Sequence, residues 1–420
     1  MTDTIRIAIS GGGLAGASLI HALLQHPHLD AHIFESASEF KEAGAAVGIA
    51  RNALSALDLI GPSAAQCLER AGAVPMRGVQ FMLAQGEHAG SMIDEARDID
   101  GQRLTSIVHR AAFLRELLRA VPPERMHAAK KLERVEQVDG NGGAITLYFA
   151  DGTTHECDVL IGADGIHSTV RKIILGQDDP AAEPRNAGWW GVMALKPYAE
   201  AQSSFGEGSI DAANPREHMW VGDGACLMHN VLSDGELVQV VISAREEKAE
   251  GADRWHRFVD AKEIAKLYHD WPPHLNKAVK ELLCNEPQQP AIYLWDHPPA
   301  RTYTSENICI TGDAAHATTP WQGSGGGMSI EDTLILSTLL SRAKTPKDAT
   351  AALKAYDQVR RPRTQRIVES SRGTGLIITG QGEETQLDLH RLKEKVLPRW
   401  DFILNIDMEK HRDDAIKLMK

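Results

Sequence analysis

The chain has 420 residues, enough for two domains around separate cores. Its 45 Lys and Arg residues against 57 Asp and Glu give a formal net charge of −12, which argues against nucleic acid or an anionic membrane as a partner. Five scattered cysteines without a C-x-x-C pair argue against a disulfide framework or structural zinc, and no apolar run approaches the ~18 residues of a membrane span. With no signal-peptide pattern at residue 1, we expect a cytoplasmic enzyme that needs no metal.

A strand, a glycine-rich turn and a helix open the chain in close succession. The short apolar run 5–9 predicts a buried strand, residues 15–24 a helix and residues 31–34 a second strand. Three glycines of the turn have the spacing G-x-G-x-x-G: Gly11, Gly13 and Gly16. Such glycines allow a tight turn, the approach of a pyrophosphate and close packing of helix on strand. Glu35 ends the second strand, where a carboxylate can accept hydrogen bonds from a ribose. The order predicts a site for FAD or NAD, without separating the two.

Two further junctions between a strand and a polar segment suit the edge of a cofactor. Arg110 stands between a predicted strand at 105–109 and a helix at 111–118, where its guanidinium could hold a cofactor oxygen or simply be exposed. Asp164 follows a strand at 158–161 and opens a polar Asp-Gly loop. Both side chains are candidate cofactor contacts.

The pattern changes to antiparallel strands from about residue 189. We expect strands at 190–195, 218–221, 225–232 and 237–244, with a separate hairpin formed by 79–83 and 91–93. Helical segments at 263–271 and 275–283 lead the chain back. These residues predict a sheet module inserted into the first domain.

A second glycine run follows another buried strand, at 307–311. Gly312, Asp313 and His316 come directly after that strand, and glycines within 323–327 open a long helix at 328–340. A glycine-rich helix N-terminus is a second site suited to an anion. Because NAD needs only one such turn and a larger dinucleotide could use both, the pair favours FAD. His316 is expected to be a scaffold residue rather than a catalytic one.

The C-terminal region reads as helical, from 351 to 371 and again after 387. Four arginines of the first helix are expected on a solvated face rather than against an acidic partner: Arg360, Arg361, Arg363 and Arg366.

Three separated motifs give the chain a family resemblance. GGGLAG with Glu35, CDVLIGADGIHSTVR, and CITGDAAHATTPWQGSGGGMSIED occur in that order. In these motifs the chain resembles the single-component FAD-dependent aromatic hydroxylases, nearest to their salicylate hydroxylase-like branch with its fungal phenol-modifying members. The resemblance covers nearly the whole chain.

The resemblance implies roles for individual residues. Glu35 would bind the adenosine ribose, and the Ala46 region would pass its backbone along the FAD. Arg110 would contact the cofactor, and Asp164 would serve both FAD and the passing NAD(P)H. Asp313 would hold the ribityl chain, while Gly326 would present a backbone N–H near the flavin ring.

The substrate sheet departs from the family pattern. Where some phenol-oxidising relatives place an arginine, this chain has Trp189 and Trp190. His229 is a candidate for deprotonating or orienting a phenol, because an imidazole has a pKa near neutrality, although a buried sheet histidine without such a role is the alternative. Trp190, Trp220 and Met228 are candidates for an apolar wall against a flat ring.

The expected fold class is α/β, with a Rossmann-like FAD-binding domain, an inserted antiparallel β-sheet substrate domain and a helical C-terminal region. The FAD-binding domain would be discontinuous, over 1–75, 101–180 and 290–375. Residues 76–100 and 181–289 would form the substrate domain, and 376–420 the C-terminal extension.

The resemblance further implies a monooxygenase reaction. NAD(P)H would reduce FAD, and O2 would then hydroxylate a phenolic substrate through a flavin hydroperoxide, with or without decarboxylation of a hydroxybenzoate. The alternatives are an NAD-dependent dehydrogenase and a flavin-binding protein that does not hydroxylate. Substrate identity, the choice between NADH and NADPH, and monomer or homodimer stay open at this point.

Overall fold

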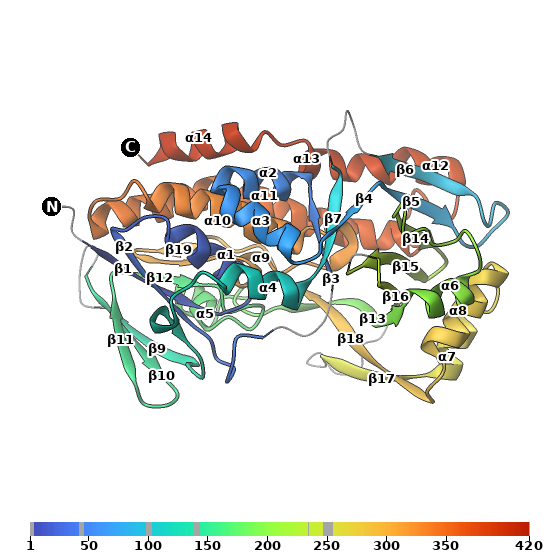
Figure 1. The fold of residues 1–420 in the computed structure, drawn as a ribbon, viewed down its shortest axis with the longest axis horizontal. Coiled ribbons are helices and arrows are strands. Elements are labelled where there is room, and N and C mark those ends of the chain that lie inside the picture. The colour runs from blue at the N-terminus through green and yellow to red at the C-terminus, as the bar shows by residue number, and fades with distance from the viewer. Residues whose placement is uncertain are drawn as a thin grey trace.

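The computed structural model describes residues 4–41, 46–97, 103–137, 143–233, 235–246 and 255–419. Helices and strands alternate along the chain and gather around two sheets (Figure 1). One sheet is mainly parallel and lies towards the end of the molecule that holds both termini. The other is mainly antiparallel and forms the opposite end.

The first sheet has six strands in the order β19-β20-β12-β1-β2-β8. Its strands are β1 (Ile5–Ser10), β2 (Leu29–Phe34), β8 (Met126–His127), β12 (Val159–Gly162), β19 (Thr304–Ser305) and β20 (Ile308–Ile310). All neighbours pair in parallel except the edge strand β19. The strand ends that precede the glycine turn, the Asp-Gly loop and the Gly-Asp loop therefore lie side by side in β1, β12 and β20.

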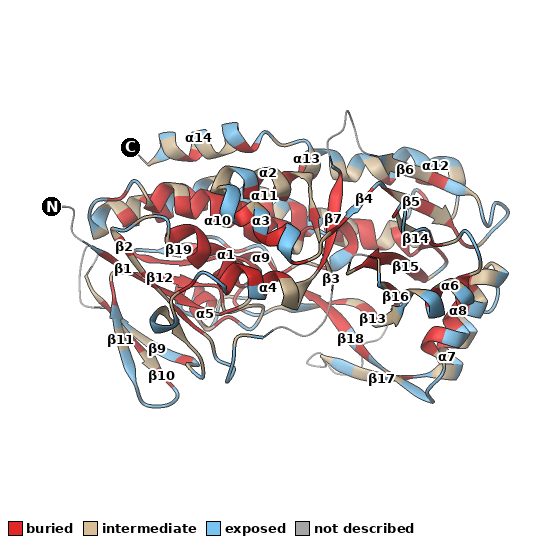
Figure 2. Ribbon diagram, viewed as in Figure 1, coloured by how far each residue is buried: buried red, intermediate tan, exposed pale blue. Residues whose placement is uncertain are grey.

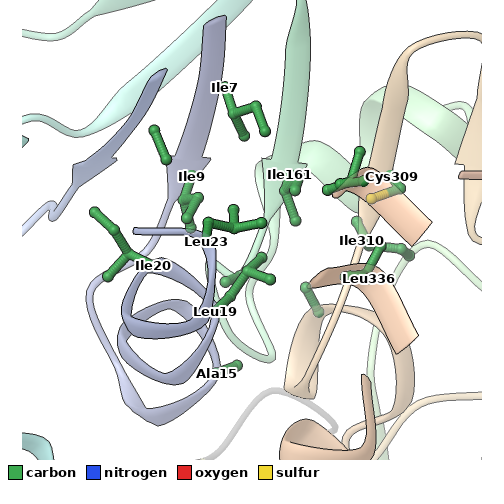
Figure 3. Packing of buried hydrophobic residues seen from close by; sticks show 14 of the residues in the cluster. Ile7, Ile9, Ala15, Leu19, Ile20, Leu23, Ile161, Cys309, Ile310 and Leu336 are labelled. Atoms are coloured by element: carbon green, nitrogen blue, oxygen red, sulfur yellow. The ribbon is translucent and has the colours of Figure 1, made fainter. Parts of the chain in front are cut away.

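Helix α1 (Leu14–Leu23) is buried along its whole length because it is covered on two sides. The side chains of Ile7 and Ile9 on β1 meet Leu19 and Leu23 of α1 (Figure 3). Helix α10 (Gly325–Leu340) covers the other side of α1, and nearly every one of its residues is buried. Figure 2 colours α1 as buried, in agreement with its position between the sheet and α10. This packing fixes the N-termini of both helices relative to the sheet.

The second sheet has eight strands in the order β17-β18-β13-β16-β15-β14-β5-β6. They are β5 (Gly78–Leu83), β6 (Met92–Arg97), β13 (Arg185–Pro197), β14 (Glu217–Val221), β15 (Ala225–Leu232), β16 (Leu237–Arg245), β17 (His256–Asp260) and β18 (Gln288–Asp296). The predicted hairpin β5–β6 joins this sheet through a parallel pairing of β5 with β14, while the other pairings are antiparallel. Strand β18 carries the sheet beyond residue 289, up to Asp296.

Smaller elements fill the space around the two sheets. The three-stranded sheet β3-β7-β4 consists of β3 (Ala46–Ala50), β7 (Thr105–His109) and β4 (Val74–Met76), and β11-β10-β9 consists of β9 (Leu132–Gln137), β10 (Ile145–Phe149) and β11 (Thr154–Cys157). The helices are α2 (Arg51–Ile60), α3 (Pro62–Arg70), α4 (Arg110–Leu118), α5 (Thr169–Leu175), α6 (Tyr198–Phe205), α7 (Ala261–Leu267), α8 (Pro273–Leu283), α9 (Asp313–His316) and the short 3₁₀ turns η1 (Pro123–Arg125) and η2 (Pro320–Gln322).

One long helix links the two ends of the molecule. Helix α11 (Pro346–Ile378) has 33 residues and is thus about 50 Å long. It begins at a capping box in which Thr345 and Asp348 bond each other's backbone N–H groups. The C-terminal elements that follow are α12 (Leu389–Lys395), η3 (Leu397–Trp400), α13 (Asp401–Leu404) and α14 (Met408–Leu418).

Candidate cofactor and substrate site

A cavity of about 830 Å³ lies between the two sheets. At one end its wall is formed by the loops that follow β1, β12 and β20 and by the N-terminus of α10. At the other end its wall is formed by strands β5, β6, β14, β15 and β16 together with η3 and α13. The two ends are called here the loop end and the sheet end.

Helix N-termini and charged side chains line the loop end. Gly13 and Ala15 contribute the start of α1, and Gly325 and Gly326 the start of α10. Neither helix has a side-chain hydrogen bond from its N-cap residue, so the N-terminal N–H groups of both helices are not satisfied by a capping side chain. Further residues that line this end include three of the predicted cofactor contacts: Ala46, Arg110 and Asp313.

The glycine turn after β1 is closed too tightly for side chains. Gly11 has φ +111°, and a Cβ on it would lie 2.1 Å from the carbonyl oxygen of Ala163. A Cβ on Gly16 would lie 2.0 Å from the carbonyl oxygen of Gly11. The predicted need for glycine at these two positions is therefore confirmed: Gly11 lies against the backbone that follows β12, and Gly16 of α1 lies against the backbone of the turn itself.

Glu35 lies against this turn rather than in the cavity wall. Its carboxylate accepts hydrogen bonds from the backbone N–H of Gly12 and of Ala37, each at 2.7 Å. The side chain is thus held at the outer side of the turn, half-buried, at the end of β2.

Asp164 turns away from the cavity and caps a helix. Its carboxylate accepts hydrogen bonds from the hydroxyl of Ser168 and from the backbone N–H of Val170 at 3.1 Å, at the start of α5. Burial raises its pKa, and these hydrogen bonds act in the opposite direction. The residues on either side, Ala163 and Gly165, do line the cavity. Asp164 therefore stabilises the conformation of this loop without forming part of the cavity wall.

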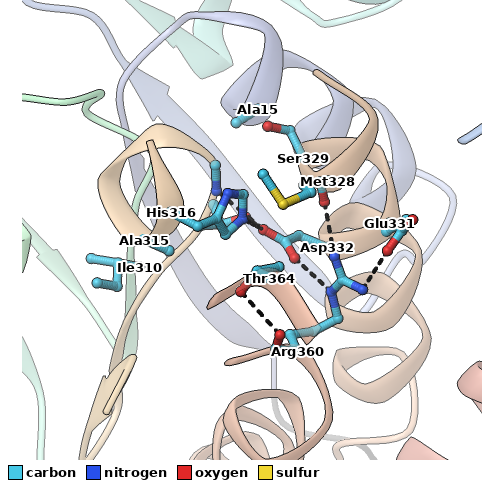
Figure 4. Close-up of polar contacts among 12 residues, drawn as sticks. Ala15, Ile310, Ala315, His316, Met328, Ser329, Glu331, Asp332, Arg360 and Thr364 are labelled. Carbon is cyan, nitrogen blue, oxygen red and sulfur yellow. Dashed lines mark hydrogen bonds and ion pairs between the residues drawn. The ribbon is translucent and has the colours of Figure 1, made fainter. Parts of the chain in front are cut away.

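A buried network of charges fixes the loop end (Figure 4). Asp332 of α10 accepts hydrogen bonds from Arg360 Nε at 2.7 Å, from Thr311 Oγ1 at 3.0 Å and from the backbone N–H of Gly312 at 3.2 Å. His316 Nε2 lies 2.6 Å from the same carboxylate. The network therefore joins the loop before Asp313 to α10 and α11, and His316 occupies the scaffold position expected of it.

Glu331 extends the network to the start of α2. Its carboxylate accepts hydrogen bonds from Arg360 Nη1 at 2.5 Å, from Arg363 Nε at 2.8 Å and from Asn52 Nδ2 at 2.5 Å. Burial alone would raise the pKa of Glu331, but Arg360 and Arg363 outweigh burial and lower the pKa to about 2. His316 and Arg360 likewise outweigh burial at Asp332 and lower its pKa, so both carboxylates are charged in the folded protein.

The expectation of a solvated arginine face on α11 is wrong for two of the four residues. The side chain of Arg360 is 0% exposed and that of Arg363 is 10% exposed, because both turn towards the acids of α10. Arg361 pairs with Asp357 on its own helix and is half-buried, while Arg366 is exposed, as expected.

The sheet end has an apolar row across three strands. Phe81 on β5, Met219 on β14 and Met228 on β15 lie opposite one another in the register and all line the cavity. Trp321 and Trp400 close the cavity beside this row, and the rings of Phe81 and Trp400 have centroids 5.3 Å apart. These flat and flexible side chains suit an aromatic ligand.

A polar row lies two residues away on the same face. Glu217, Asn230 and Gln239 stand on β14, β15 and β16, and all three line the cavity. No sequence motif marks these three residues: Glu217 comes just before the predicted strand 218–221, and Asn230 and Gln239 lie inside predicted strands. Strand alternation was the available signal: if Met228 faces the ligand, so does Asn230, two residues on.

Alternation also explains where three other candidates lie. His229, Trp190 and Trp220 do not line the cavity and are buried in the described structure on the other side of their strands. The ring of His229 packs against Phe205 of α6, with centroids 4.4 Å apart, and burial lowers its pKa well below the ordinary value. Of the four substrate-side candidates, only Met228 reaches the cavity.

The loop end fits a dinucleotide with a diphosphate. Two helix N-termini point at one cavity, and Arg51 Nε, also in the cavity wall, is buried without a hydrogen-bond partner among the described residues. Positive dipole ends beside a guanidinium match a pyrophosphate.

The described residues contain no group of three or more His, Cys, Asp or Glu side chains that could hold a metal. Within the same ranges, no helix is long and apolar enough to cross a membrane.

Comparisons with known proteins agree with this geometry. The family model described as FAD binding domain matches residues 4–371. The chain is 36% identical over 427 residues to 6-methylsalicylate 1-monooxygenase of Aspergillus terreus, covering 99% of this chain and 93% of that protein. It is 30% identical over 423 residues to a salicylate hydroxylase of Pseudomonas putida, covering 96% and 92%.

Solved structures show the same fold. A salicylate hydroxylase substrate complex superposes with a TM-score of 0.84 at 23% identity, covering 99% of both chains. HpxO of Klebsiella pneumoniae complexed with FAD and uric acid superposes with a TM-score of 0.76 at 23% identity, covering 99% of this chain and 98% of that one.

Proposed function

Because the chain belongs to the FAD binding domain family and to its FAD-dependent aromatic monooxygenases, we propose that it hydroxylates a hydroxybenzoate with NAD(P)H and O2. The names of the relatives support this substrate class, since 6-methylsalicylate and salicylate are both hydroxybenzoates. Loss of the carboxyl group during hydroxylation is part of the proposal, and product analysis distinguishes it from simple hydroxylation.

One observation carries the proposal: the dinucleotide-binding loops and an apolar sheet face are two ends of a single cavity. A cofactor held at the loop end would present its reactive ring towards the row of Phe81, Met219 and Met228. A plain NAD-dependent dehydrogenase would need only the first glycine turn, whereas here the start of α10 faces the same space.

We propose that the predicted cofactor residues act at the loop end. Gly13 and the start of α1 would receive the pyrophosphate, with Arg51 and Arg110 beside it. Asp313 is exposed to the cavity and would accept hydrogen bonds from the ribityl hydroxyls.

Two acids and a glycine complete the proposed cofactor site. Glu35 would accept hydrogen bonds from the ribose hydroxyls through the lone pairs that its bonds to Gly12 and Ala37 leave free. Asp164 would hold the loop after β12 in position. Gly326 would offer a backbone N–H to the ring system.

When bound, FAD supplies the electron transfer from NAD(P)H and the activation of O2. The protein positions the cofactor and the substrate, and it excludes water from the space between them. Trp321 and Trp400 cover the apolar row, which keeps the reacting face dry. The buried charges of Asp332 and Arg360 hold the Asp313 loop and the start of α10 in fixed places, so these groups need no reorganisation when charge develops nearby.

The setting of the enzyme is also part of the proposal. All five cysteines are free thiols, which suits the reducing cytoplasm. No second G-x-G-x-x-G turn for NAD(P)H is evident in the sequence, so the nicotinamide would be a passing reductant rather than a resident group.

The test is turnover with a panel of phenols and hydroxybenzoates under isotopically labelled dioxygen. We expect a hydroxybenzoate to stimulate NAD(P)H oxidation and one labelled oxygen atom to appear in the aromatic product. A product lighter than its substrate would identify decarboxylation. An unlabelled product, or peroxide without any hydroxylated product across the panel, would contradict the proposal.

A further inference from the structure

The polar row at the sheet end is built by three neighbouring strands. Asn230 pairs with Gln239 across β15 and β16, and Glu217 is next in the register of β14 with β15, opposite Asn230. Cross-strand neighbours have their Cβ atoms about 5 Å apart, so the three polar ends can reach one small ligand group. All three side chains open onto the cavity.

Two members of this row have oxygen atoms without a protein partner. Gln239 is 6% exposed, and its Oε1 has no hydrogen-bond partner among the described residues. The carboxylate of Glu217 makes no hydrogen bond or ion pair with any described residue, and burial raises its pKa to about 7. The residue is half-buried and lines the cavity, so a ligand in the cavity can reach its carboxylate.

The neighbouring cations are already engaged elsewhere. Arg216, the residue before Glu217, donates to Glu95 at 2.7 Å, and Arg97 donates to the same carboxylate. Among the described residues, the row thus offers two oxygen acceptors without a partner, the Glu217 carboxylate and Gln239 Oε1, and it contains no guanidinium. Acceptors of this kind match a group that donates a hydrogen bond, and a buried polar site left without its partner disfavours ligands that lack one.

We propose that Glu217 is the catalytic base that receives the proton of the substrate's phenolic hydroxyl, with Gln239 and Asn230 orienting that hydroxyl. The inference rests on the proposed function and adds the residue that recognises the hydroxyl. The ring then lies over the apolar row of Phe81, Met219 and Met228, two residues along the same strands.

The proton transfer balances without any co-reactant. The O–H bond of the phenol breaks, its electron pair stays on the oxygen, and a new O–H bond forms on the Glu217 carboxylate. The resulting phenolate donates more electron density to the ring, which favours attack by an electrophilic oxygen at the neighbouring positions. No atom changes oxidation state in this step, and the proton returns to the oxygen when the product leaves.

Other titratable groups around the cavity are less well placed for this step. His218 and His229 lie on the opposite face of their strands, and neither lines the cavity. The remaining ionisable residues of the cavity wall are Arg51, Glu95, Arg97, Arg110, Asp313 and Asp401. Glu95 is held by two arginines, Asp313 lies at the loop end, and Asp401 is an exposed residue of α13 outside the polar row.

The experiment compares Glu217→Gln, Glu217→Asp and the control Glu236→Gln, an exposed glutamate beyond the cavity at the start of β16. FAD content, kcat/KM and labelled product are measured from about pH 5.5 to about 8.5 with the hydroxybenzoate that the wild type converts fastest. The wild type should gain activity as pH rises through about 7, because the base must be ionised.

Glu217→Gln should retain FAD and lower kcat/KM by ~10²-fold or more. Its kcat/KM should no longer rise with pH through about 7, which is the acid limb of the wild-type pH profile. Glu217→Asp should keep the limb at a reduced rate, and Glu236→Gln should match the wild type. The role of Glu217 is wrong, while the proposed function stands, if the wild type hydroxylates and Glu217→Gln keeps the wild-type rate and pH profile. Loss of FAD from Glu217→Gln would also contradict this role. A wild type that forms no labelled product with any hydroxybenzoate overturns the proposed function and the inference together.

Discussion

Replacing Arg360 with methionine tests how strongly the buried charge network stabilises the fold. Its guanidinium donates to Asp332 Oδ1 at 2.7 Å, to Glu331 Oε2 at 2.5 Å and to the carbonyl of Met328 at 3.2 Å, and its side chain is 0% exposed (Figure 4). Removing one partner of a buried pair costs about 3–5 kcal/mol, because the remaining charge is left without compensation. Here His316 and Arg363 still bond the two acids, so we expect about 3 kcal/mol, a large part of the ~5–15 kcal/mol of a typical domain.

The assay is urea unfolding, followed by circular dichroism and by flavin release. Arg366→Met is the matched control, since this exposed arginine of the same helix lies 4.1 Å over the ring of Phe402 and should contribute at most about 1 kcal/mol. Glu331 also gives a pH signature: its lowered pKa stabilises the fold above the ordinary value of 4.5, and this contribution is lost as pH falls towards about 2. Equal losses for Arg360→Met and Arg366→Met would refute the reasoning.

Three further experiments test the cofactor site and a buried histidine. Asp313→Ala should weaken FAD binding by ~1.5–3 kcal/mol, measured by flavin loss on dialysis, because the ribityl hydroxyls lose a charged acceptor; full retention would contradict this role. Gly326→Ala should lower FAD affinity more than Gly327→Ala does, since the added Cβ would lie 2.8 Å from Val47 Cγ2 in the cavity wall but 3.4 Å from its nearest neighbour at Gly327; equal titration curves would argue against that placement. His297→Phe should reduce the stability lost between about pH 6.5 and 5 by ~1.5–2 kcal/mol, measured by urea unfolding at each pH. Burial lowers the pKa of His297 to about 3, so only the unfolded chain takes up the proton in that range, and an unchanged pH dependence would exclude the effect.

The cofactor end of the fold could be predicted because its signals are local. The strand, glycine turn and helix at 5–24 follow one another without interruption, and Asp313 comes three residues after the end of its strand. Such segments show their period and their turn residues within a few positions of each other. The structure therefore brings together Gly13, Arg110 and Asp313, which are far apart in the sequence.

The burial of Arg360 and Arg363 depends on acids of another helix, so no signal in the sequence around the two arginines indicates it. Charged residues around a helix ordinarily indicate a solvated surface. Their partners, Glu331 and Asp332, are adjacent acids in a helix that is buried on nearly all sides, and this position was the available hint.

The sheet end was harder to predict because it required the face of each strand. A shift of one residue exchanges the two faces, so choosing His229 instead of Asn230 selects the wrong side of β15 for a ligand. The parallel pairing of β5 with β14 joins strands far apart in the chain, so no hairpin turn in the sequence predicts it. Glu217 lies at the start of β14, where predicted boundaries are least reliable.

The central claim is that one cavity holds one FAD between two helix N-termini, and counting the flavin tests it most directly. Protein purified without added cofactor, or soaked in FAD and desalted, should show the visible flavin absorbance with one FAD released per chain on denaturation. A colourless protein that stays colourless after soaking, or one that binds NAD instead, would contradict the account.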